Sequence, residues 1–163
     1  MSATGSSHFE VRRKKMVAEP HQLTGVAERE YIHVMLVEDS KLIRQALTEA
    51  LASSDVARFD GFASTSQEAI EVLRSRRFDM VVVDIELAHG TGFDVLQEIN
   101  KPDFPYPTPI SMVLTNHAYV IYRHRAQALG VKYFFDKSMH FNEAIDVIEK
   151  EAAALLDDNS DND

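Results

Sequence analysis

Short hydrophobic runs alternate along the chain with longer segments whose apolar residues recur at helical spacing. The runs have the composition of buried strands and span residues 31–37, 56–63, 80–83, 110–114 and 131–135. Helical segments follow them, beginning after Ser40, Thr65 and Gly92 and then spanning residues 118–129 and 141–156. This alternation predicts an α/β fold: a doubly wound, flavodoxin-like, five-stranded parallel sheet in the order 2-1-3-4-5 with five helices.

Capping residues mark where several of these helices begin and end. Ser40 can accept a hydrogen bond from the first helical turn, and Thr65 followed by Glu68 has the spacing of a capping box. Gly130 stands just after a helix, where a left-handed backbone conformation is favoured. These signals support the predicted succession of strands and helices.

The two ends of the chain lack any such pattern. Residues 1–30 are polar, and their short basic cluster at residues 12–15 is interpreted as solvated, with contact to an anionic partner as the alternative. Residues 157–163 are acidic and have nothing to bury. We therefore expect one domain over residues 31–156, preceded by a flexible arm and followed by a frayed acidic tail.

Composition excludes several classes of function. The formal net charge of −9 repels polyanions, so direct binding of nucleic acid is not expected. The absence of cysteine excludes thiolate catalysis, disulfides and cysteine-bound metals, and the seven histidines lack the paired spacing of a zinc site. No apolar stretch has the length of a membrane span or the character of a signal peptide. The chain is expected to be cytoplasmic, without a membrane partner.

Acidic residues stand where two of the predicted strands end. Glu38 and Asp39 follow the strand at 31–37, and Asp84 follows the strand at 80–83. The carboxyl ends of parallel strands meet at one edge of a sheet, so these three side chains are expected to lie close together. Three carboxylates repel one another unless a cation lies among them, and hard oxygen ligands suit Mg²⁺. The sequence therefore predicts a Mg²⁺ site.

Two further residues complete a site of a defined chemical kind. Thr115 ends the fourth strand and Lys137 follows the fifth, so a hydroxyl and an ammonium group are expected beside the carboxylates. Each residue alone has an ordinary structural interpretation, but their common position at one sheet edge favours a functional site. The combination suits phosphoryl transfer, with a carboxylate as nucleophile forming an acyl phosphate.

The order and spacing of these residues resemble the receiver domain of bacterial two-component response regulators. The resemblance covers about residues 31–156. It rests on Leu36-Val37-Glu38-Asp39-Ser40, on Val83-Asp84-Ile85-Glu86-Leu87 with Gly92 eight residues after the aspartate, on Leu114-Thr115-Asn116, and on Phe134-Phe135-Asp136-Lys137-Ser138.

The resemblance implies a role for each acidic residue of the site. Asp84 is the expected phospho-acceptor, with its carboxylate at the end of the central strand. Glu38 and Asp39 are expected to hold Mg²⁺ together with Asp84 and the main-chain carbonyl of Glu86. The cofactor that the resemblance implies is thus Mg²⁺, bound only through oxygen.

By the same resemblance, Thr115 reaches the phosphoryl group, Lys137 pairs with it, and Phe134 is the switch aromatic residue. The chain departs from the family pattern after Lys137, where Ser138 replaces the usual proline. A cis peptide before a residue other than proline costs about 3–4 kcal/mol, so we expect a trans Lys137–Ser138 bond.

Two side chains are candidates for controlling how long a phosphoryl group persists. Glu86 lies two residues beyond Asp84, and His117 lies two residues beyond Thr115. Both are expected to flank the path of water toward the acyl phosphate, where Glu86 could orient the water and His117 could accept a hydrogen bond from it. The alternative is that both point into solvent.

The resemblance also implies the partners. A sensor histidine kinase or a histidine phosphotransfer protein would donate the phosphoryl group, and a protein target would bind the face formed by residues 118–129, 131–135 and 141–156. A homodimer is left open. The flanks are too short to fold as an effector, so we expect a stand-alone signalling module, not an enzyme.

A hydrolase of the phosphatase type with an aspartyl nucleophile is the alternative function. Glu86 occupies the place of the second acid in such enzymes, two residues after the nucleophile. Those enzymes usually need a cap insertion that binds substrate, and this chain has no room for one. A flavodoxin-like cofactor binder is disfavoured as well, since Gly90-Thr91-Gly92 lacks the third glycine of a dinucleotide-binding loop.

Overall fold

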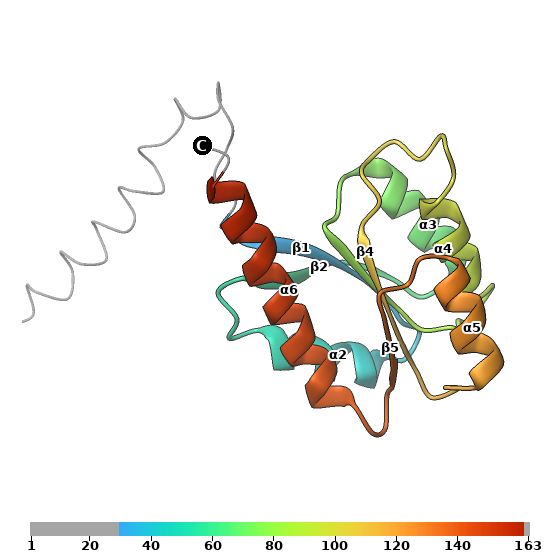
Figure 1. Cartoon of the computed structure of the whole chain (residues 1–163). Coiled ribbons are helices and arrows are strands. Elements are labelled where there is room, and N and C mark those ends of the chain that lie inside the picture. Colours follow the sequence, from blue (N-terminus) through green and yellow to red (C-terminus); the bar gives the residue numbers. More distant parts are fainter. Residues whose placement is uncertain (1–29, 162–163) are drawn as a thin grey trace, which may run out of the picture.

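The computed structural model describes residues 30–161, which form a five-stranded parallel sheet with helices on both faces (Figure 1). The sheet order is β2-β1-β3-β4-β5, as predicted. The strands are β1 Ile32–Val37, β2 Ala57–Ala63, β3 Met80–Val83, β4 Ile110–Thr115 and β5 Tyr133–Asp136, and the helices are α2 Lys41–Leu51, α3 Ser66–Ser75, α4 Gly92–Ile99, α5 Val120–Ala128 and α6 Phe141–Asp161. Apart from residue 30, the predicted N-terminal arm lies outside the described residues.

Two apolar layers hold the helices against the sheet. Helices α2 and α6 cover one face, and α3, α4 and α5 cover the other (Figure 1). Every residue of β3 is buried: Met80 and Val82 pack toward α2 and α6, whereas Val81 and Val83 pack toward the opposite layer. This two-sided burial explains the continuous apolar run of the central strand, since a parallel strand between two helical layers has no solvated face.

Hydroxyl side chains begin three of the helices that follow the strands. Ser40 accepts a hydrogen bond from the amide of Ile43, as predicted, and Thr65 accepts one from the amide of Glu68. The prediction of a full capping box at Thr65 is wrong, because the Glu68 carboxylate accepts from the Ser64 amide instead. A reciprocal capping box occurs at α4. The Asp94 amide donates to the Thr91 hydroxyl, and the Thr91 amide donates to the Asp94 carboxylate.

The C-terminal helix is longer than the sequence pattern suggested. Helix α6 continues through residues 157–161, where a frayed tail was expected. Neither glycine nor proline interrupts this stretch, and the Ser160 hydroxyl donates to the carbonyl of Asp157 at 2.8 Å. The helix therefore runs past its last apolar residues, and its final turn carries exposed acidic side chains. None of the helices over residues 30–161 combines the length and apolarity needed to cross a membrane.

Gly92 fixes the turn that carries the end of β3. Its amide donates to the carbonyl of Ile85 at 2.9 Å, and a Cβ atom at this position would lie 2.3 Å from the carbonyl oxygen of Asp84. The neighbouring atom belongs to the backbone and cannot rotate away. Only glycine therefore allows α4 to begin this close to the strand end.

The substitution Gly92→Ala is predicted to lower the free energy of unfolding by about 1–3 kcal/mol and to displace Asp84, because the added methyl group overlaps its carbonyl. Gly130→Ala is the matched control. Gly130 has a φ of 80°, and a Cβ atom there would meet only Asn100 Oδ1, at 4.0 Å, so that variant loses about 1–2 kcal/mol through backbone strain alone. Chemical denaturation measures both losses, and only the Gly92 variant is expected to lose Mg²⁺-dependent phosphorylation as well.

Candidate phosphorylation site

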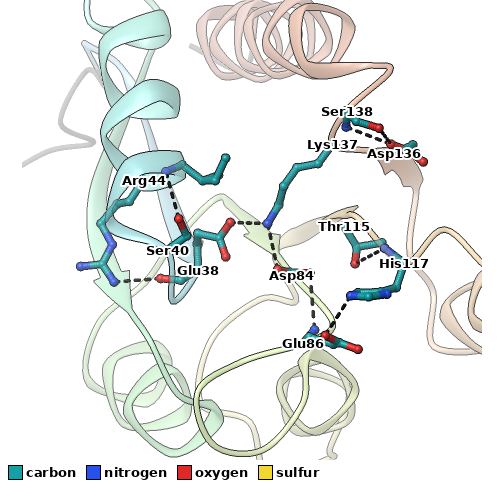
Figure 2. Close-up of polar contacts among 11 residues, drawn as sticks. Glu38, Ser40, Arg44, Asp84, Glu86, Thr115, His117, Asp136, Lys137 and Ser138 are labelled. Atoms are coloured by element: carbon teal, nitrogen blue, oxygen red, sulfur yellow. Dashed lines mark hydrogen bonds and ion pairs between the residues drawn. The ribbon is translucent and has the colours of Figure 1, made fainter.

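The carboxyl ends of β1, β3 and β5 bring four charged side chains together, three of which, Glu38, Asp84 and Lys137, are labelled in Figure 2. Carboxylate oxygens of Glu38, Asp39 and Asp84 lie within 4.8 Å of one another. The Nζ of Lys137 donates to Asp84 Oδ2 at 2.9 Å and forms an ion pair with Glu38 Oε1. The predicted juxtaposition of these residues at one sheet edge is therefore present in the fold.

The four side chains of this cluster differ in their exposure to solvent. Glu38, Asp84 and Lys137 are buried, with Glu38 only 1% exposed, whereas Asp39 is open to solvent. The second carboxylate oxygen of Glu38, Oε2, is buried and has no hydrogen-bond partner among the described residues. A buried carboxylate oxygen without a partner is costly. A divalent cation held between it and the exposed Asp39 would remove that cost, so the residues present fit Mg²⁺.

Burial also shifts the ionisation of the cluster. Desolvation raises the pKa of Glu38 to about 7, against the opposing effect of Lys137, and the nearby Asp84 carboxylate adds to the rise. For Lys137, burial alone would lower the pKa, but the hydrogen bonds to Glu38 and Asp84 outweigh it and raise the pKa. Lys137 is therefore a fixed cation at neutral pH, while Glu38 titrates there.

Arg44 on α2 supports the turn between β1 and α2, a role that the sequence reasoning missed. Its Nη2 donates to the main-chain carbonyl of Glu38 at 2.8 Å (Figure 2). It also donates to the hydroxyl of Ser64 at 2.6 Å. These bonds tie the strand end that carries Glu38 and Asp39 to the loop after β2. The signal available in the sequence was an arginine one turn after the N-cap Ser40.

Thr115, Glu86 and His117 lie on the side of Asp84 away from Glu38 (Figure 2). Thr115 is fully buried at the end of β4, and its hydroxyl oxygen accepts a hydrogen bond from the His117 amide at 3.1 Å. The Nε2 of His117 lies 2.8 Å from Oε2 of Glu86, an ion pair when the imidazole is protonated (Figure 2). The Glu86 amide in turn donates to Asp84 Oδ1 at 3.4 Å. The sequence placed Glu86 and His117 beside the same path of water without predicting a contact between them, and the structure pairs them.

Phe134 lies on β5 beside the end of β4. It pairs in register with Val113 and is half-buried against the apolar layer that contains α3, α4 and α5. After Lys137 the chain turns through Ser138, whose amide and hydroxyl both donate to Asp136 Oδ1. All described peptide bonds are trans, so the Lys137–Ser138 bond is trans, as expected.

The chain belongs to the response regulator receiver domain family, whose family model matches residues 34–149. Among solved structures, the non-phosphorylated HemR receiver domain of Leptospira biflexa is 32% identical and covers 74% of this chain and 91% of its own, with a TM-score of 0.60. The receiver domain of the putative response regulator NarL from Mycobacterium tuberculosis, 19% identical, covers 77% of this chain and 98% of its own and shares the fold with a TM-score of 0.67.

Curated relatives match over a shorter region. A protein-glutamate methylesterase/protein-glutamine glutaminase of Pyrococcus abyssi is 34% identical over 82 residues, which is 50% of this chain and 22% of that protein. The chain thus spans about a fifth of the length of the curated relatives it matches. What the family membership establishes is a phospho-accepting signalling module of the two-component type.

The raised pKa of Glu38 predicts how the metal-free stability depends on pH. The folded state binds this proton more tightly than the unfolded chain, so its contribution is complete below about pH 4.5 and is lost as the pH rises through about 7. At pH 8 without Mg²⁺, Glu38→Gln should be about 1–3 kcal/mol more stable than the wild type, and at pH 4 equally stable. Added Mg²⁺ should stabilise the wild type and not the variant.

Urea denaturation across pH 4 to 8 measures this difference. Glu49→Gln, an exposed change on α2, is the control and should follow the wild type at every pH. Parallel curves for the wild type and Glu38→Gln would contradict the assigned ionisation.

Proposed function

We propose that Asp84 accepts the phosphoryl group from a phosphorylated histidine of a sensor kinase or a histidine phosphotransfer protein. The observation that carries this proposal is the convergence of the Asp84 carboxylate, the Lys137 ammonium group and the unpartnered Glu38 oxygen at one sheet edge. An Asp84 oxygen attacks phosphorus, the phosphorus–nitrogen bond breaks, and the imidazole leaves with the bonding electrons. The product is an acyl phosphate on Asp84.

Glu38, Asp39, Asp84 and the main-chain carbonyl of Glu86 would hold Mg²⁺. When bound, the ion supplies positive charge that offsets the negative charge of the phosphoryl oxygens. On the protein side, Lys137 already donates to Asp84 and is positioned to pair with a phosphoryl oxygen next to it. The Thr115 hydroxyl accepts from the His117 amide and keeps its own proton available for donation.

The transferred group would be read out by other proteins. Helix α5 exposes Val120 and Ile121 at 71% and 73%, and together with β5 and α6 it forms the face that we propose for a downstream target. We place this module in the cytoplasm, where its phosphoryl donors operate, and leave self-association of the face as a further proposal. The methylesterase activity named for the curated relatives is not proposed for this chain, because the match covers 22% of the Pyrococcus abyssi protein.

Hydrolysis of a separate phosphate ester by the same nucleophile is the weaker proposal. It would need Glu86 as a second acid beside Asp84. The Glu86 carboxylate instead contacts His117, and 62% of its side chain is exposed. A single stoichiometric acyl phosphate, without turnover of an added phosphate ester, distinguishes the receiver from the hydrolase.

Replacement of the acceptor tests the central assignment. Asp84→Asn should abolish Mg²⁺-dependent labelling by acetyl phosphate, because the amide is too weak a nucleophile to attack phosphorus. Intact-mass measurement should show one added phosphoryl group on the wild type and none on the variant. Asp146→Asn, an exposed change on α6, is the control and should label fully. Full labelling of Asp84→Asn would overturn the assignment.

The pair formed by Glu86 and His117 is proposed to govern the lifetime of the acyl phosphate. While His117 holds the Glu86 carboxylate, that group is not free to orient water for attack on phosphorus. His117→Ala should therefore speed dephosphorylation several-fold, and Glu86→Ala should slow it. The double variant should match Glu86→Ala.

Phosphorylated protein freed of donor, followed by intact mass over time, gives these rates. The exposed Glu71→Ala on α3 serves as the control. Unchanged rates in both single variants would remove the pair from the mechanism and leave the receiver assignment intact.

A further inference from the structure

Arg123 on α5 makes two contacts with a single residue of the sheet. Its guanidinium carbon lies 4.6 Å from the centre of the Phe134 ring, and its Nη1 donates to the Phe134 carbonyl at 3.2 Å. One side chain thus binds both the ring and the backbone of the residue at the predicted switch position. A phenylalanine ring offers no hydroxyl, so the face of the ring is what a partner can recognise.

Few other interactions hold α5 in place. Of its nine residues, all within the described part of the chain, Ala126 is buried. Tyr119, the N-cap residue, makes no side-chain capping bond in the described structure. A second arginine, Arg125, lies 4.2 Å from the centre of the Phe93 ring on α4. The Tyr122 ring packs edge-on against Phe93, with 5.5 Å between the ring centres, and is partly buried against the same apolar layer as Ala126. The two cation–π contacts therefore add to a small apolar contact in attaching this helix.

The segment from Thr115 to Arg123 is linked to β5 at both of its ends. Thr115 ends β4, the loop leads into α5, and Arg123 returns to Phe134, which pairs with Val113 on β4. The loop is short, and the amide of its second residue, His117, donates to the Thr115 hydroxyl. We expect a displacement of Thr115 toward a phosphoryl group to be passed along this loop to the contact between Arg123 and Phe134.

We propose that Arg123 is the positioning residue of Phe134 and the link through which the phosphorylation state reaches α5. Without a phosphoryl group, the guanidinium holds the helix on the ring and the carbonyl of Phe134. When Asp84 carries a phosphoryl group, the segment from Thr115 to Arg123 shifts and the contact of Arg123 with Phe134 is lost. Helix α5, with its exposed Val120 and Ile121, then becomes available to a partner. The inference rests on the proposed phosphorylation of Asp84 and adds the residue that transmits it.

Hydrogen exchange of the α5 amides in the full chain tests the inference, with Mg²⁺ present and with or without acetyl phosphate. Phosphorylation should raise exchange over residues 120–128 in the wild type. Arg123→Ala should raise it about fivefold before any donor is added, equal to about 1 kcal/mol, and should show little further rise on phosphorylation. Arg123→Lys should lie between the two, because a lysine keeps the charge and loses the planar fork.

Arg125→Ala is the matched control, since it removes the same side chain from the same helix and its contact is with Phe93. In the background Phe134→Leu, Arg123→Ala should raise exchange less than it does in the wild type, because only the bond to the main-chain carbonyl is left to lose, whereas Arg125→Ala should keep its full effect. Independent effects of Arg123 and Phe134, or a normal phosphorylation response in Arg123→Ala, would overturn the role of Arg123. Failure of the wild type to accept a phosphoryl group would instead overturn the proposed function.

Discussion

The buried contact of Lys137 with Glu38 and Asp84 is the interaction on which the arrangement of the site depends. It joins the ends of β1, β3 and β5 and places one ammonium group between two carboxylates. Buried charges are tolerated only when they are paired and hydrogen-bonded, and here one cation faces two anions with exposed Asp39 beside them. The excess of negative charge makes the edge of the sheet receptive to a cation, and burial, with a smaller contribution from Asp84, raises the pKa of Glu38.

The groups on the two sides of Asp84 differ in how firmly the fold holds them. On one side, the ion pairs of Lys137 are shielded from water, and Arg44 fixes the adjoining turn. On the other, Glu86 and His117 meet at the surface, where an ion pair contributes little to stability. Strong contacts thus fix the acidic groups, and weak contacts hold the loops beside the position proposed for the phosphoryl group. This difference allows the charged cluster to stay rigid while the loops that carry Glu86 and His117 move.

Much of this arrangement follows from the sequence for a simple reason. Hydrophobic runs locate the strands, and parallel topology carries their ends to one edge, so Asp84 and Lys137 could be placed together without any knowledge of loops. The contacts that escaped prediction depend on loop geometry and side-chain direction. The pairing of Glu86 with His117 and of Arg123 with Phe134 joins segments whose mutual distance no periodicity encodes. The length of α6 escaped for another reason, because its last turn has no apolar residues to reveal it.

Two-sided burial of β3 also limits how relatives of this chain can vary. Its register is set on one side by Val37 against Val83 and on the other by Val113 against Val83. Because successive strand residues point to opposite faces, inserting or deleting one residue within β3 would turn Asp84 away from Lys137 and move buried apolar side chains of the strand into the wrong layer. Insertions and deletions are therefore expected in the loops. The number of residues between the start of β3 and the acceptor Asp84 is fixed by the packing of the strand.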